Sequence, residues 1–126
     1  MTPQQHDISI LERIVEYCDE INKTTAHFGA SLATLKANSI YKNALAMCIL
    51  QIGELTTHLT NEFKITHPMV PWNEIKKMRN IAAHHYGSFS VEFLWDTVMD
   101  DIAPLRENCR ACIAELEMPS AVESDT

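Results

Sequence analysis

Glycine and proline are scarce in this chain of 126 residues, with three and five occurrences. An all-β fold needs many tight turns, which these two residue types make, so their scarcity argues against such a fold. The apolar runs are too short for a membrane-spanning helix, and the first eight residues lack the pattern of a secretory signal. We therefore expect a cytoplasmic protein whose four cysteines are reduced thiols.

Positive charge is concentrated in one short segment of an acidic chain. The formal net charge is −7, whereas residues 64–86 hold four Lys or Arg residues against Glu74 alone, which gives this segment a net charge of +3. Binding to bulk nucleic acid needs many Lys and Arg contacts, so the composition excludes a general polyanion binder. One local anion site in this segment remains compatible with the composition.

Apolar residues recur at helical spacing along most of the chain, and no segment alternates with a period of two. The first pattern predicts a helix over 7–27, with Asp7 as its N-cap and Gly29 as its stop. A short helical turn follows Ser31, and the next pattern predicts a helix that Ser39 caps and that runs to Phe63.

Two further helices complete the predicted fold. The first covers 71–85 and ends at Gly87, while Ser88 or Ser90 caps a long last helix that is kinked near Asp100. The sequence therefore predicts an all-α, antiparallel bundle of four main helices, with a short extra helical turn and a kinked long C-terminal helix. We expect one domain over 1–118 and a disordered acidic tail over 119–126.

Cys109-Arg-Ala-Cys112 matches a C-x-x-C pattern, but both cysteines lie on the apolar stripe of the last helix. Neither the surroundings of a thioredoxin-like redox pair nor a second pair of zinc ligands is present. We interpret both as buried helical thiols and expect neither a metal site nor a cofactor.

The densest polar cluster is Arg79-Asn80-Ile-Ala-Ala-His84-His85-Tyr86. Asn80 and His84 are four residues apart and share a helix face, so Asn80 is placed to orient His84. Arg79 and His84 are five apart, roughly 140° around a regular helix, and do not share a face. The pattern alone fits either a catalytic site or a polar helix end.

Glu54 lies beside the apolar stripe of the second long helix, next to Gly53. It is either a solvated edge residue or a carboxylate that pairs with Arg79 or a histidine. The small Gly53 permits a close approach of another helix at this point.

The cluster Arg79-Asn80-x-x-x-His84-x-Tyr86 resembles the R-x-x-x-x-H-x-Y signature of the HEPN superfamily, in its HepT-like ribonuclease toxin branch. Three further segments resemble that branch in the same order, and the similarity covers residues 7–116. These segments are Ile52-Gly53-Glu54, the run from Val70-Pro71-Trp72 to Met78, and Trp95 followed by Asp101-Ile102-Ala103-Pro104-Leu105. Ala103 and His85 depart from the family pattern.

The resemblance implies a metal-independent endoribonuclease. It assigns His84 as general base or acid, Arg79 as a phosphate clamp and Asn80 as a residue that positions one of them, with Glu54 in support. His85 leaves open which imidazole acts. Lys76 and Lys77 are the expected phosphate or RNA contacts.

The resemblance also implies partners. Toxins of the HepT-like branch form homodimers. They are neutralised by a minimal nucleotidyltransferase antitoxin, which adenylylates the tyrosine at the position of Tyr86. That tyrosine is otherwise an ordinary aromatic residue at a helix end. The competing function is a non-catalytic HEPN protein that binds nucleotides or assembles with a nucleotidyltransferase.

Overall fold

The computed structural model describes residues 1–84 and 90–118, and these residues form helices and no strand. The main helices are α1 (Pro3–Phe28), α3 (Ser39–Thr57), α5 (Trp72–His84) and α7 (Ile102–Glu117). The shorter elements are α2 (Leu32–Lys36), α4 (Asn61–Thr66), α6 (Val91–Asp96) and the π-helical segment η2 (Thr97–Asp101). The predicted all-α bundle is confirmed.

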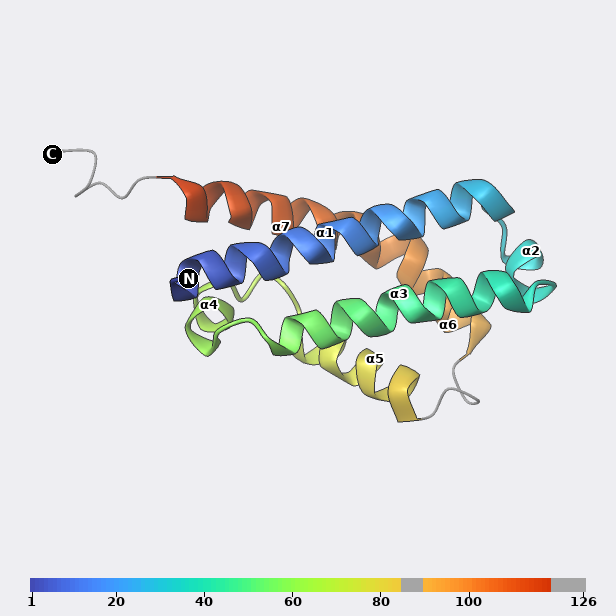
Figure 1. The fold of residues 1–126 in the computed structure, drawn as a ribbon. Helices are drawn as coiled ribbons and strands as arrows, with labels where there is room; N and C mark the ends of the chain where they lie inside the picture. The colour runs from blue at the N-terminus through green and yellow to red at the C-terminus, as the bar shows by residue number, and fades with distance from the viewer. Residues whose placement is uncertain (85–89, 119–126) are drawn as a thin grey trace, which may run out of the picture.

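The main helices lie side by side in the order α7, α1, α3 and α5, and neighbours run in opposite directions (Figure 1). α1 packs against both α7 and α3, and α3 packs against α5. α4 lies at one end of the bundle and α2 at the other (Figure 1). This order places α5 at the edge of the bundle, where only part of its surface is used for packing.

The core is built from the apolar stripes that the sequence predicts. Leu11, Ile14, Cys18 and Ile21 on α1 are completely buried. Facing side chains come from α3 and from the last helix, and include Leu45, Ile49, Ile52, Val98, Ile102, Leu105, Cys109 and Cys112. Full burial of one such aliphatic side chain stabilises a fold by about 1.5–3 kcal/mol, so these stripes dominate the packing free energy.

Cys109 and Cys112 are both buried and free, as predicted. Burial raises the pKa of the Cys109 thiol to about 12 and also raises the pKa of the Cys112 thiol. A buried thiol that stays protonated behaves as a small apolar side chain. The C-x-x-C pattern is therefore part of the core.

The first helix begins earlier than the sequence predicts. Thr2, not Asp7, is the N-cap: Thr2 Oγ1 accepts from Gln5 N at 3.1 Å, and Gln5 Oε1 accepts from Thr2 N at 2.9 Å. This reciprocal pair is a capping box. Asp7 lies within α1. The helix ends before Gly29, as expected, and Gly29 has a φ of 113°.

The second long helix ends at Thr57, and the prediction that it continues to Phe63 is wrong. In a continuous helix the Thr60 N–H would donate to the carbonyl of residue 56. Here it donates to the buried carboxylate of Asp7 at 2.9 Å, and the Thr60 hydroxyl donates to the same carboxylate at 2.7 Å. Thr60 then caps α4, which carries the buried Phe63. The hydrogen bonds of Thr60 with Asp7, which is 53 residues away in the chain, thus replace the helical hydrogen bond at this point.

The caps of the other helices differ in detail. Asn38, not Ser39, caps α3, since Asn38 Oδ1 accepts from the backbone N–H groups of Ile40 and Tyr41. Ser90 caps α6 as one of the two predicted candidates, and its hydroxyl accepts from Phe93 N at 3.2 Å. Ser88 and Gly87 lie outside the described residues.

The last helix departs from regular α-helical geometry where a kink was predicted near Asp100. Residues Thr97–Asp101 form the π-helical segment η2 between α6 and α7. Pro104 follows closely and has no N–H to donate to the residue 100 carbonyl.

The predicted tail over 119–126 lies outside the described residues. No helix within 1–84 or 90–118 has the length and apolar character required to cross a lipid bilayer.

Candidate functional site

Glu54 on α3 and Arg79 on α5 form an ion pair across the contact between these helices. Arg79 Nε donates a hydrogen bond to Glu54 Oε1, and Arg79 Nη2 contacts the same oxygen. The two side chains are 38% and 27% exposed, so the pair lies at the surface and is partly shielded from water. The sequence allowed Glu54 to be either a solvated edge residue or a carboxylate with a partner, and in the structure it is the carboxylate that pairs with Arg79.

Gly53 brings the two helices together at this pair. A Cβ atom placed on Gly53 would lie 2.7 Å from Arg79 Cγ and 3.3 Å from Arg79 Cα. Real Cβ atoms essentially never come within 3.0 Å of another heavy atom, so the Cγ distance is a clash, and the Cα distance is tighter than most real contacts. Gly53 is therefore the residue that lets the base of the Arg79 side chain lie directly against α3, as its small size predicted.

The hydrogen bonds of Arg79 fix its guanidinium group in one orientation. Besides the contacts of Nε and Nη2 with Glu54, Arg79 Nη1 donates to Asn80 Oδ1 at 2.8 Å. An arginine has five N–H donors in a planar fork. Three of them face protein acceptors, so at most two remain for a ligand, and these belong to Nη1 and Nη2.

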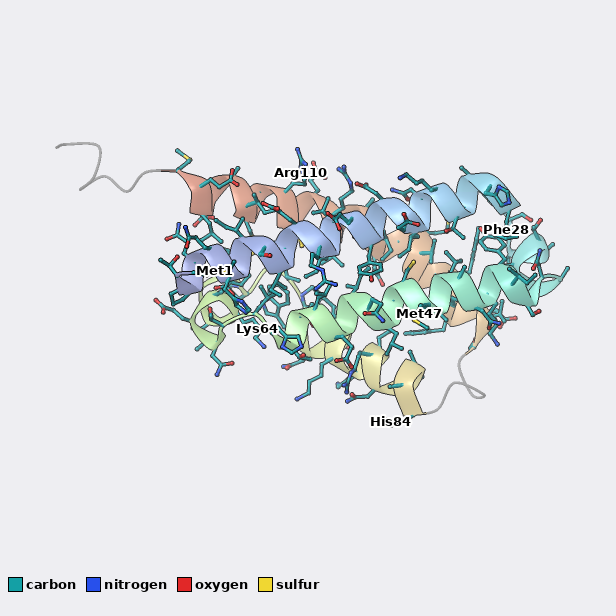
Figure 2. All side chains as sticks on the ribbon, viewed as in Figure 1. Met1, Phe28, Met47, Lys64, His84 and Arg110 are labelled. Carbon is teal, nitrogen blue, oxygen red and sulfur yellow. The ribbon has the colours of Figure 1, made fainter. Side chains whose placement is uncertain are left out.

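His84 is the last residue of α5 and is exposed. It lies about 7.5 Å beyond Arg79 along the helix axis, from a rise of 1.5 Å per residue. Figure 2 shows it at the end of α5, on the outside of the bundle. No hydrogen bond between described residues joins His84 to Glu54, Arg79 or Asn80. The amide of Asn80 is bonded to Arg79 instead.

The predicted site residues therefore fall into two groups. Glu54, Arg79 and Asn80 come together, whereas His84 is separate within one chain. His85 and Tyr86 lie outside the described residues.

The two predicted RNA-contacting lysines have different surroundings. Lys76 and Lys77 are both exposed on α5. Lys77 Nζ lies 3.5 Å from Glu74 Oε1, whereas Lys76 forms no ion pair with any residue of the described ranges. Lys76 is three residues before Arg79 and therefore lies one turn away on a similar face.

A groove that the sequence did not predict lies between α4, the end of α3 and the start of α5. Its volume is about 680 Å³, and its lining includes Thr57, Lys64, Trp72, Asn73 and Lys76. The net positive charge of residues 64–86 was the only signal for it. The place of Trp72 depends on how α4 folds against α5, which helical spacing does not reveal.

The described residues contain no group of three or more His, Cys, Asp or Glu side chains that could hold a metal ion. α5 carries the guanidinium group of Arg79, the amide of Asn80 and, one turn earlier, the ammonium group of Lys76, and the Glu54 carboxylate on α3 contacts the guanidinium group. This set can bind an anion through hydrogen bonds and charge.

Comparison with known proteins gives a consistent result. A family model described as "Ribonuclease HepT-like" matches residues 10–112. A protein of Thermococcus cleftensis named "Probable ribonuclease HepT" is 42% identical over 55 residues, which are 44% of this chain and 50% of that protein. No solved structure matches the chain.

Longer matches have lower identity. A protein of Caldanaerobacter subterraneus subsp. tengcongensis, named as a candidate RNase, is 27% identical over 79% of this chain and 88% of its own. A candidate RNase of Methanocaldococcus jannaschii is 26% identical over 91% of this chain and 93% of its own. The family model covers most of the chain, including α3, α5 and the ion pair between them. The protein therefore belongs to the HepT-like family of ribonucleases.

Proposed function

We propose that this protein is the toxin of a toxin–antitoxin pair and that it cuts RNA by using the 2′-hydroxyl group of the RNA as the nucleophile. The observation that carries the proposal is the orientation of Arg79 by Glu54 and Asn80. A permanent cation held in a fixed orientation, with N–H groups left over, is suited to stabilise the charge that develops on a phosphate in the transition state.

The chemistry needs two proton transfers. A base removes the 2′-hydroxyl proton while the 2′-oxygen bonds to phosphorus. The bond from phosphorus to the 5′-oxygen breaks, and an acid protonates that oxygen. The products are a 2′,3′-cyclic phosphate and a 5′-hydroxyl end. An imidazole can serve as either base or acid in a reaction near neutral pH, and we assign this role to His84. Because the nucleophile belongs to the substrate, the reaction does not require a metal-bound water.

We propose a homodimer as the active form. Arg79 and His84 of one chain point to different sides of α5 by roughly 140°. A two-fold axis perpendicular to α5, passing between these two positions, would bring the Arg79 of one chain toward the His84 of its partner. The position of α5 at the edge of the bundle leaves its surface available for this contact.

We further propose that a nucleotidyltransferase antitoxin silences the enzyme by adenylylating Tyr86. The tyrosine follows His84 by two residues, and α5 is described as far as His84. An adenylyl group there brings a phosphate charge that competes with the substrate for Arg79 and adds bulk beside the cut.

Cleavage assays test the chemistry. The purified protein is expected to cut RNA in EDTA, to leave the matched 2′-deoxy strand intact, and to yield cyclic phosphate ends. Arg79→Ala and His84→Ala should each lower the rate of cutting by at least about 10²-fold without loss of the helical circular dichroism signal. Lys23→Ala on α1 is the control, since Lys23 is exposed and lies outside the site. RNA or nucleotide binding without cleavage would instead identify the non-catalytic HEPN function.

Two further measurements test the partners. Sedimentation at micromolar concentration should give a dimer, and an active monomer of 14.3 kDa would contradict the shared site. Co-expression with a nucleotidyltransferase encoded by an adjacent gene should raise the mass by whole AMP units and stop cleavage. Tyr86→Phe should remain active and unmodified. A Phe variant that is modified and silenced equally well would exclude Tyr86 as the acceptor.

A further inference from the structure

We propose that the groove between α4 and the start of α5 holds the RNA strand on one side of the cut phosphate. The inference rests on the proposed ribonuclease function and extends it from a single phosphate to several nucleotides. It assigns Lys64 and Trp72, which lie outside the R-x-x-x-x-H-x-Y signature, to the binding of substrate.

The groove lies next to the Arg79 cluster along both α3 and α5. Thr57 lines the groove and is three residues after Glu54 on α3, and its hydroxyl donates to the Glu54 carbonyl at 2.6 Å. Lys76 also lines the groove and is three residues before Arg79 on α5. On both helices the groove thus begins one turn from the ion pair, which is close enough for a strand bound by Arg79 to extend into it.

The charge of the groove favours a polyanion. Lys64 and Lys76 both line it, and neither has an ion pair with another residue in the described part of the chain. Glu74 also lines it, but its carboxylate faces Lys77 at 3.5 Å. Because the protein as a whole carries a charge of −7, the phosphates of a strand are repelled from most of the surface and attracted here.

The aromatic ring of Trp72 is held in a fixed position at one side of the groove. Its indole Nε1 donates to the carbonyl of His67 at 3.0 Å, and its ring meets Phe63 edge-to-face with centroids 5.9 Å apart. These contacts hold the ring while part of its surface lines the groove. Proteins bind single strands by combining cationic side chains with aromatic rings on which bases stack, and this groove has both.

The dimensions fit a short segment of RNA. Trp72 and Arg79 are seven residues apart on α5, which corresponds to about 10 Å along the axis. Stacked nucleotides advance about 3.4 Å each, so about three nucleotides span this distance. The volume of about 680 Å³ lies in the usual range for sites that enclose a small ligand. Figure 2 shows Lys64 and His84 toward opposite ends of α5, so the strand would leave the groove in the direction of the imidazole.

A substrate series tests the proposal. The substrates are a dinucleotide with one phosphodiester bond and two longer RNAs that add three nucleotides on the 5′ side or on the 3′ side. For the wild type, extension on one side is expected to raise kcat/KM at least tenfold. Trp72→Leu and Lys64→Ala should each remove at least about fivefold of that gain, and each should lower kcat/KM more for the extended substrate than for the dinucleotide. Trp72→Phe should retain most of the gain, and Lys23→Ala should retain all of it.

A binding measurement tests the groove proposal independently of cleavage. In a Trp95→Phe chain, Trp72 is the only tryptophan, and a 2′-O-methyl decanucleotide lacks the nucleophile and stays intact. Its binding should quench the Trp72 fluorescence. Lys64→Ala should reduce the slope of log K against log salt by about 0.7, the value for one phosphate contact on a single strand.

The outcomes separate the two proposals. Absence of cleavage with quenching intact refutes the ribonuclease mechanism and supports the groove. Cleavage in which the variants lower dinucleotide and extended substrates equally refutes the groove. Binding by fluorescence anisotropy with unchanged Trp72 emission and an unchanged salt slope also refutes it, and identifies the groove as a surface for another class of partner.

Discussion

Gly53 on α3 and Arg79 on α5 are so close that no side chain fits between them. A Cβ on Gly53 would lie 2.7 Å from Arg79 Cγ and 3.3 Å from Arg79 Cα. The contact is with the base of the arginine side chain and its backbone, so rotation of a flexible side-chain end does not relieve it. The position of the guanidinium group therefore depends on the absence of a side chain at Gly53, on the neighbouring helix α3.

Gly53→Ala should both destabilise the protein and impair cleavage. The added methyl group forces α3 and α5 apart, and overpacking of this kind typically costs about 1–3 kcal/mol. The same displacement moves Arg79 away from its productive position. Urea unfolding measures the first effect and RNA cleavage per folded molecule measures the second. Gly29→Ala is the control, because it strains a residue with a φ of 113° remote from the ion pair and should reduce stability alone.

Stability should fall as the pH rises above about 9. Burial raises the pKa of the Cys18 and Cys109 thiols from 9.0 to about 12. Between these values the unfolded chain loses thiol protons that the folded chain keeps, so unfolding becomes more favourable with increasing pH. The slope approaches about 1.4 kcal/mol per pH unit for each thiol. The contribution is fully present below pH 9 and disappears by about pH 12.

Urea unfolding at pH 8 and at pH 10 measures this slope. Cys109→Ala creates a small cavity and lowers stability at both pH values, but it should flatten the pH dependence because the titrating group is gone. The difference between the wild type and this variant removes the contribution of lysines and tyrosines that ionise in the same range. An identical slope in both proteins would show that the Cys109 thiol does not ionise differently in the two states.

Helical periodicity predicted the bundle because burial of apolar stripes determines which segments become helices. The spacing of Leu11, Ile14, Cys18 and Ile21 needs no knowledge of a partner helix, and all four are buried as expected. The same reasoning failed at Phe63. Its apolar stripe is intact and Phe63 is buried, but the helix that carries it is a different one. The break depends on Asp7 and Thr60, whose pairing is not visible in a local pattern.

The candidate site was predictable to a similar extent. The sequence placed Glu54 beside the apolar stripe with Arg79 or a histidine as alternative partners, and Gly53 as a point of close approach. Only the crossing of α3 over α5 selects Arg79. Trp72 was recognised only as part of the family-like run that begins at Val70 and was given no role, because its exposure to the groove depends on α4. In the homodimer that we propose, a second chain completes the site around His84, and a single sequence does not specify that contact directly.

A pair of single substitutions distinguishes the two adjacent imidazoles. His84→Ala should lower kcat by at least about 10²-fold, the lower range for removal of a general acid or base. His85→Ala should change kcat by only a few-fold. Circular dichroism verifies that both variants remain helical. If His85→Ala is the inactive variant and His84→Ala is active, the assignment of His84 is wrong.

The role of Glu54 can be separated into charge and geometry. Glu54→Gln retains an oxygen that accepts from Arg79 Nε and removes the negative charge, whereas Glu54→Ala removes both. If Glu54 acts by orienting the guanidinium group, Gln should retain most of the activity and Ala should lose about tenfold or more, mainly in kcat, since a misplaced clamp stabilises the transition state poorly.

The ion pair itself is partly exposed, so its loss should lower the free energy of unfolding by only about 1 kcal/mol or less. Urea unfolding of both variants checks this limit. The double variant Glu54→Ala, Arg79→Ala should be no less active than Arg79→Ala alone, because Glu54 has no function without the group that it holds. A further loss in the double variant would mean that Glu54 contacts the substrate directly, and Arg79 would then not be the route through which it acts.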